Sequence, residues 1–178
     1  MNKFLLVILA TPCLCIAQGH PVKNPPNADP DPIFRANETS LDVFGSVSIG
    51  QEVIDNISRR RVEDNGRLGL GLGVTHFFIR QLGLSADAYT ENTHHSFVDN
   101  TSGNLVFRVP IDSLHFSPYA YGGAGYQFDP SRLWFGQAGA GVEFRFTQQI
   151  GLFADGRYVF TDGTQNYGVG RLGLRLVF

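Results

Sequence analysis

Residues 67–78 read RLGLGLGVTHFF, and large apolar side chains in this stretch alternate with small or polar ones. From Leu68 to Val74 every second residue is leucine or valine, which is the side-chain period of a β-strand and not of a helix. The same alternation recurs along the chain as far as Phe178. The sequence therefore predicts an all-β protein.

Segments with this period of two are long and even in number. They cover residues 41–49, 67–78, 82–91, 105–111, 116–128, 134–146, 150–160 and 167–178. Strands of soluble proteins average about 5 to 6 residues, and most of these segments are longer. A strand tilted by about 45° needs roughly 9 to 11 residues to cross a bilayer, and closed membrane barrels of this kind have even strand numbers. We therefore predict an eight-stranded antiparallel up-and-down transmembrane β-barrel over residues 41–178.

The connections between these segments alternate in length. Short turns are expected at residues 79–81, 112–114 and 147–149, and longer connections at residues 51–65, 92–103, 129–132 and 162–166. Outer-membrane barrels have short periplasmic turns and longer extracellular loops. With a periplasmic N-terminus, we expect the four longer connections at the extracellular end.

The charges decide which face of the predicted barrel meets lipid. In the last three segments they share a face with glycines, at Glu143, Arg145, Asp155, Arg157, Arg171 and Arg175. An arginine on the lipid face near the bilayer midplane costs about 2 to 4 kcal/mol, so we expect these charges inside. A soluble ligand-binding barrel would have the opposite arrangement, and alternation by itself does not distinguish the two. Small residues beside charges of both signs are typical of a narrow, filled lumen, which favours the membrane barrel.

Aromatic residues gather near the expected strand ends, where membrane proteins carry interfacial aromatic belts. They are Phe77, Phe78, Tyr119, Tyr121, Tyr126, Phe128, Trp134 and Phe135. We expect part of this group, but not every member, to face lipid.

We predict a network of charges inside the barrel. Its members are Arg67, Asp87, Arg108, Glu143, Arg145, Asp155, Arg157, Arg171 and Arg175, and Asp42 and Glu91 are expected on the same face. In a narrow lumen these groups would form charge-assisted pairs. Structural ion pairs that fill the lumen are the preferred interpretation, because the interior of an eight-stranded barrel is filled by side chains. A narrow gated pore is the alternative.

The first 40 residues are expected to lie outside the barrel. Residues 1–17 combine Lys3, a short apolar run and small residues before Gln18, which is typical of a cleaved secretory signal peptide. Residues 18–40 are rich in proline and are expected to form a periplasmic linker. Both cysteines, Cys13 and Cys15, lie in the predicted signal peptide, so no disulfide is expected in the mature chain.

The composition argues against nucleic-acid binding and against disorder. The formal net charge is -2, with 43% hydrophobic and 17% charged residues and 21 glycines. Lys3 and Lys23 are the only lysines, so the other basic residues are arginine. Such a chain has no broad basic surface for a polyanion and is too apolar for a disordered polymer.

The segments PYAYGGAGYQF, GQAGAGVEFRFTQQIGLFADGRYVF and GVGRLGLRLVF, between Pro118 and Phe178, resemble the small outer-membrane β-barrel family that includes OmpA-type and OmpX-type proteins. The resemblance spans residues 41–178. It implies export to the bacterial outer membrane and contact with outer-membrane lipid and lipopolysaccharide. It also implies that Phe178 is part of the signal that the barrel-assembly machinery reads on the last strand.

No catalytic, cofactor or metal site is expected. His94 and Ser96 have the H-x-S spacing of the outer-membrane lipid A deacylase, a barrel with a serine nucleophile activated by histidine. They fall in a polar connection, however, and no glutamate follows at a comparable distance. The adjacent His94 and His95 lack a third ligand at metal-site spacing.

We therefore predict a non-catalytic monomer with a structural or surface-interaction role through its extracellular loops. The run Arg59, Arg60 and Arg61 in the first of these loops could contact lipopolysaccharide or a host surface. The sequence names no ligand or host partner. A narrow pore, a lipid A-modifying enzyme on the same scaffold and a soluble ligand-binding barrel are the alternatives.

Overall fold

The structure is a computed structural model that describes residues 31–50, 52–54, 61–63, 66–91, 98–129, 132–161 and 166–178. Residues from Pro32 to Phe178 pack as one unit. The signal peptide expected at residues 1–17 lies outside the described residues and stays a prediction. No helix in this part of the chain is long and apolar enough to span a membrane.

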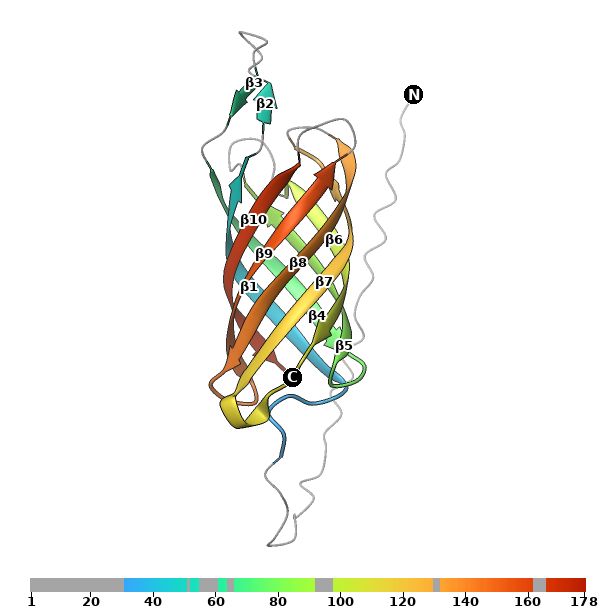
Figure 1. Ribbon diagram of the computed structural model, residues 1–178, viewed down its shortest axis with the longest axis vertical. Coiled ribbons are helices and arrows are strands. Elements are labelled where there is room, and N and C mark those ends of the chain that lie inside the picture. The colour runs from blue at the N-terminus through green and yellow to red at the C-terminus, as the bar shows by residue number, and fades with distance from the viewer. Residues whose placement is uncertain are drawn as a thin grey trace, which may run out of the picture. The chain divides into compact units, whose positions relative to one another are not determined.

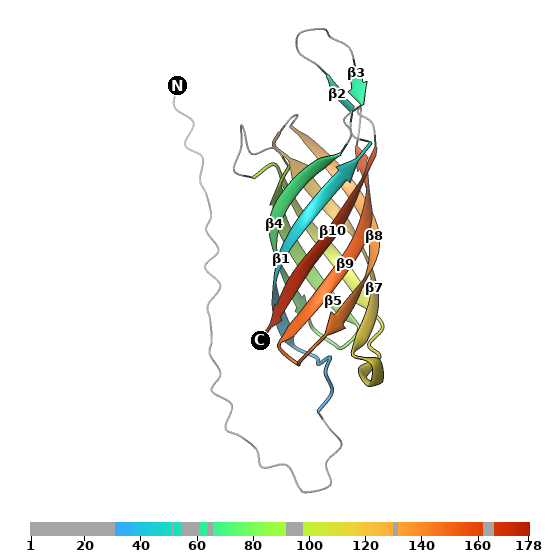
Figure 2. The same cartoon turned by 90° about the vertical axis from the view of Figure 1, so that its left-hand side faces the viewer.

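Eight strands close into a single antiparallel barrel (Figures 1 and 2). They are β1 (Glu38–Ile49), β4 (Arg67–Phe77), β5 (Leu82–Thr90), β6 (Asn100–Arg108), β7 (Phe116–Gln127), β8 (Leu133–Arg145), β9 (Ile150–Thr161) and β10 (Tyr167–Val177). Each strand pairs with its sequence neighbours in the barrel, and β1 also pairs with β10, for example Ser40 opposite Val177. The predicted up-and-down barrel is confirmed.

The two ends of the barrel differ. Short connections at residues 78–81, 109–115 and 146–149 lie at one end, where η1 (Asp112–Leu114) forms a single 3₁₀ turn (Figure 1). The other end has the two longest connections, residues 50–66 and 91–99, and two of five residues, 128–132 and 162–166, which are shorter than the connection at residues 109–115. Between β1 and β4, β2 (Glu52–Ile54) and β3 (Arg61–Glu63) pair as a separate two-stranded sheet. We call these the periplasmic and extracellular ends, following the predicted orientation.

Two strands begin at an earlier residue than the sequence pattern predicts. β1 begins at Glu38 rather than Leu41, inside the stretch expected to be linker. β6 covers Asn100–Arg108 rather than residues 105–111. Its first half has polar or small residues on both faces, so no large side chains mark the period there. It ends near Pro110, which has no N–H to donate to a ladder.

Side chains alternate between an apolar exterior and a polar interior. Leu68, Leu72 and Leu172 on the outer face are 81%, 57% and 65% exposed. Arg108, Glu143 and Arg145 on the inner face are buried completely. This is the reverse of a soluble barrel, whose apolar side chains are inside.

The expected aromatic group divides between the two faces. Phe78, Phe128 and Trp134 are exposed on the outside, and Tyr126 packs edge-on against Trp134 with ring centroids 5.1 Å apart. The other members point into the lumen and are buried, namely Phe77, Tyr119, Tyr121 and Phe135. The strand period separates them, because inward and outward positions alternate whatever the side chain.

Candidate functional site

Ion pairs between distant strands cross the middle of the lumen. Asp87 on β5 accepts from Arg157 Nη1 on β9 at 3.2 Å and from Arg171 Nη1 on β10 at 3.1 Å. Arg171 Nε also donates to Asp155 Oδ1 at 2.8 Å. Asp87 therefore links strands on opposite sides of the barrel through two guanidinium groups.

Asp155 is held by hydroxyl groups as well. Tyr119 and Tyr121 on β7 donate to its two carboxylate oxygens at 2.7 and 3.0 Å. Inward-facing glycines make room for this arrangement. A Cβ at Gly139 would lie 2.6 Å from Tyr121 Cζ, and one at Gly141 would lie 2.3 Å from Asp155 Cβ.

A second chain of ion pairs lies on the periplasmic side of the first. Arg175 forms a two-pronged pair with Asp42, with Nε–Oδ1 and Nη2–Oδ2 distances of 2.8 Å. Its Nη1 donates to Glu143 Oε2 at 2.6 Å, and Arg145 Nε donates to the other Glu143 oxygen at 2.6 Å. Charge-assisted pairs with this geometry are roughly twice as strong as neutral hydrogen bonds.

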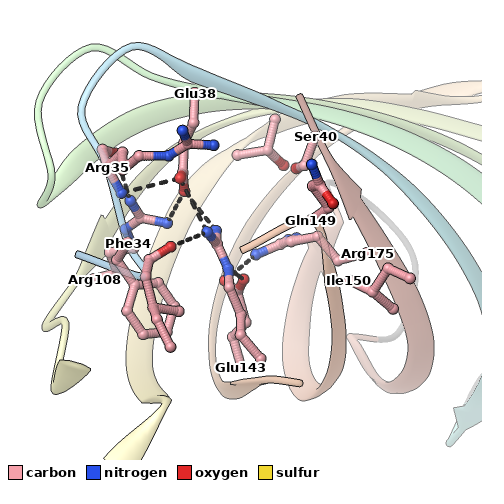
Figure 3. Close-up of polar contacts among 12 residues, drawn as sticks. Phe34, Arg35, Glu38, Ser40, Arg108, Glu143, Gln149, Ile150 and Arg175 are labelled. Carbon is pink, nitrogen blue, oxygen red and sulfur yellow. Dashed lines mark hydrogen bonds and ion pairs between the residues drawn. The ribbon is translucent and has the colours of Figure 1, made fainter. Parts of the chain in front are cut away.

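Glu38 occupies the periplasmic mouth of the lumen (Figure 3). Its carboxylate accepts from the guanidinium groups of Arg108 on β6 and Arg145 on β8, which are both fully buried. The Arg35 backbone N–H donates to Glu38 Oε2 at 3.0 Å. One carboxylate of β1 thus neutralises cations from the far wall of the barrel.

The chain before β1 covers this mouth. The Phe34 N–H donates to Asp112 Oδ1 in η1 at 3.2 Å, and Asp112 also pairs with Arg80 in the β4–β5 turn. Partial desolvation acts to raise the pKa of the Asp112 carboxyl, but the Phe34 N–H and the Arg80 guanidinium together lower it. Asp112 is therefore ionised at neutral pH and holds Phe34 in place.

The strands and Glu91 direct charges of both signs into the lumen. Six arginines and six carboxylates make up this group: Arg67, Arg108, Arg145, Arg157, Arg171, Arg175, Glu38, Asp42, Asp87, Glu91, Glu143 and Asp155. A buried charge without a partner is costly, and a balanced set can be satisfied in pairs. The group is suited to fill the barrel, and a further buried carboxylate, Asp99, lies next to Glu91 at its extracellular end.

Little space remains among these side chains. The cavity bordered by Asp42, Asp87, Arg171 and Arg175 has a volume of about 20 Å³. That is room for about one water molecule. A cavity of this size among these four side chains does not admit a substrate molecule.

Comparison with known proteins bears on the fold. No family model and no curated protein sequence matches the chain. The N-terminal β-barrel domain of Pseudomonas aeruginosa OprF aligns with 81% of this chain and 99% of its own length, with a TM-score of 0.60 and 15% identity. OprG from the same organism aligns with 81% of this chain and 97% of its own, with a TM-score of 0.55 and 13% identity. Ail, the attachment invasion locus protein of Yersinia pestis, aligns with 80% and 99%, with a TM-score of 0.52 and 19% identity.

The chain has the fold of a small outer-membrane β-barrel. The exterior of this outer-membrane barrel fits a membrane and not water, because large apolar side chains such as Leu68 and Leu172 are exposed on every side. Contiguous apolar surface on a soluble monomer rarely exceeds a few hundred Å². In hydrocarbon, a closed barrel also leaves no backbone edge unpaired. The fold and the apolar exterior together place the protein in the outer membrane.

The structure brings together most of the residues expected in the lumen of this outer-membrane barrel. Eight of the nine form the ion pairs described above: Asp87, Arg108, Glu143, Arg145, Asp155, Arg157, Arg171 and Arg175. Arg67 is half-buried at the extracellular end, near Glu91. Phe178 follows β10 and is 74% exposed, and its role as an assembly signal stays a prediction. His94, His95 and Ser96 lie outside the described residues.

Sequence reasoning missed the residues that close the periplasmic mouth. Glu38 was assigned to the linker because no large apolar residue accompanies it. Continuing the period of two backward from Asp42 through Ser40 places Glu38 on the lumen face, so the signal was present. Phe34 and Arg80 lie outside the strands, where no periodic pattern applies.

Proposed function

We propose that the protein is a closed, non-catalytic outer-membrane barrel that acts as a monomer through its extracellular loops. The filled lumen is the observation that carries this proposal. Ion pairs occupy the barrel from Glu38 to Arg157, and the cavity bordered by Asp42, Asp87, Arg171 and Arg175 is about 20 Å³. A solute needs far more space than that, which disfavours transport through the barrel. In this proposal the interior pairs are structural and the loops meet the partner.

Planar-bilayer recordings test the closed lumen. The purified protein is expected to give no stepwise conductance, because the space among the charged side chains in the middle of the described lumen holds about one water molecule. A general porin inserted under the same conditions serves as the positive control. Reproducible single-channel steps, altered by Arg157→Ala in the centre of the lumen, would favour the narrow pore instead.

A run of three arginines in a mixed-charge loop supports a surface role. Arg59, Arg60 and Arg61 fall in the long connection between β1 and β4, where Arg61 begins β3 and the two preceding arginines lie outside the described residues. One structure of Ail, 17% identical to this chain with a TM-score of 0.53, holds the heparin analogue sucrose octasulfate. We infer that the partner of this loop is an anionic saccharide, of the kind found on lipopolysaccharide or a host surface.

Replacing Arg59, Arg60 and Arg61 together with alanine is expected to weaken binding of sucrose octasulfate by about tenfold or more, because each arginine near an anionic surface contributes about 1 kcal/mol. Titration calorimetry on the detergent-folded protein measures the change. Arg132→Ala removes a single exposed arginine from another long connection and is the matched control. Equal binding by the triple variant and the unaltered protein would exclude this loop as the binding surface.

A further inference from the structure

The backbone of Ile33, Phe34 and Arg35 is bound by three arginine side chains. Figure 3 labels one of them, Arg108, together with Phe34 and Arg35. The Ile33 carbonyl accepts from Arg145 Nη1 at 2.8 Å, and the Phe34 carbonyl accepts from Arg80 Nε at 2.9 Å. The Arg35 carbonyl accepts from Arg108 Nη2 at 3.0 Å. These arginines come from β8, the β4–β5 turn and β6, so three separate parts of the barrel each hold one carbonyl.

The aromatic ring of Phe34 is enclosed at the same place. The side chain has no exposed surface. The guanidinium carbon of Arg145 lies 4.5 Å from the ring centroid and that of Arg108 lies 5.2 Å from it, distances at which a cation is attracted to an aromatic face. The Phe34 N–H completes the contacts by donating to Asp112.

Other barrel groups orient the arginines. Arg145 Nε donates to Glu143 at 2.6 Å, and Arg108 Nε donates to the Arg80 carbonyl at 2.6 Å. Glu38 pairs with both Arg108 and Arg145. The guanidinium groups of Arg108 and Arg145 are thus positioned by contacts with residues other than the three whose carbonyls they and Arg80 bind.

We propose that the periplasmic mouth is a peptide-binding site, specific for a tripeptide with a central aromatic residue, and that Ile33–Phe34–Arg35 is its ligand in cis. The three arginines bind the backbone carbonyls of the tripeptide, and a peptide of any sequence can make these hydrogen bonds. The enclosed ring of Phe34 makes the site selective for an aromatic residue at the central position. Attachment to β1 keeps the ligand at a high effective concentration, so the site is filled by its own chain. The proposal does not depend on the surface role of the loops.

The rate of trypsin cleavage after Arg35 reports whether the segment is docked. The Arg35 carbonyl is hydrogen-bonded to Arg108, and a docked backbone resists proteases. Phe34→Ala is expected to speed this cleavage by about tenfold or more in the detergent-folded protein, since the variant loses the ring that the site encloses. Cleavage after the exposed Arg132 gives an internal reference that should not change. Phe146→Ala removes an exposed phenyl ring at the same end of the barrel and is the matched control.

A labelled peptide of residues 31–37, DPIFRAN, then tests the site in trans. It is expected to bind the Phe34→Ala protein and not the unaltered protein, whose site is already filled. The same peptide with alanine in place of phenylalanine is expected not to bind either protein. Unchanged cleavage after Arg35, or a Phe34→Ala barrel that releases its segment and takes no peptide, would overturn the proposal.

Heat-modifiable gel migration shows whether Phe34→Ala folds. If it does not fold, amide hydrogen exchange measured on the unaltered protein tests the proposal instead. The amides of Phe34 and Arg35 are expected to exchange through local opening, faster than the amides of β6 and β8. Exchange of these two amides only together with the barrel strands would mean that the segment is an inseparable part of the fold and not a bound ligand.

Discussion

Replacing Glu38 with glutamine is expected to lower the free energy of unfolding by about 3 to 5 kcal/mol, which is the range observed when one partner of a buried ion pair is removed. The side chains of Glu38, Arg108 and Arg145 have 2%, 0% and 0% exposure. Glutamine keeps the size of the side chain but leaves two buried guanidinium groups short of one negative charge. Urea titration of the protein refolded into lipid vesicles measures the difference.

Asp112→Asn is the matched control for this substitution. It also removes a carboxylate at the periplasmic end, but its pair with Arg80 joins side chains that are 36% and 39% exposed. Such pairs contribute about 1 kcal/mol or less. Equal losses of stability for the two variants would show that the burial of Glu38 does not matter, and the assignment of the inner charges as structural pairs would fail.

Replacing Leu72 with arginine is expected to destabilise the barrel in lipid vesicles by about 2 to 4 kcal/mol, the cost of an arginine on the lipid face near the bilayer midplane. Leu72 lies at the centre of β4 on the outer face, and its side chain is 57% exposed. A soluble barrel would accept an arginine at such an exposed position with little change. The same urea titration in vesicles measures the cost.

Leu68→Arg tests whether this cost depends on depth. Leu68 is on the same face of β4 but near the extracellular end, and it is 81% exposed. The cost of arginine falls to about 0 to 1 kcal/mol near the interface. If both arginine variants were equally stable, the outer face would not be in contact with hydrocarbon.

Periodicity was enough to predict the barrel. Alternation in stretches such as residues 67–78 is a local property that a sequence displays directly, and a strand keeps its inward and outward positions in any sheet. It also directed Arg157, Arg171 and Arg175 to the inside, because lipid rejects arginine on the other face. The expected strand ends differ from the structure mainly at β1 and β6, where small and polar residues occupy both faces.

The partners within the lumen were not predictable in the same way. The carboxylate that pairs with Arg145 depends on the stagger of the strands and on how far each side chain extends across the barrel. The alternation of apolar and polar residues gives information about neither. Glu38 reaches Arg108 and Arg145 across 70 and 107 positions of sequence. The contacts of Phe34 depend in addition on the path of a segment without periodic structure.

The pairing of β1 with β10 imposes an order of events on folding. β1 can pair early with β4, the next barrel strand, but joins β10, the last strand of the chain, only when the barrel closes, as in the register of Ser40 with Val177. Until then one edge of β1 presents unpaired backbone groups that can join another chain. Contacts between residues so distant in sequence also form slowly. Folding therefore includes an interval in which every strand is present but the barrel is still open between β1 and β10, and protection from aggregation matters most during that interval.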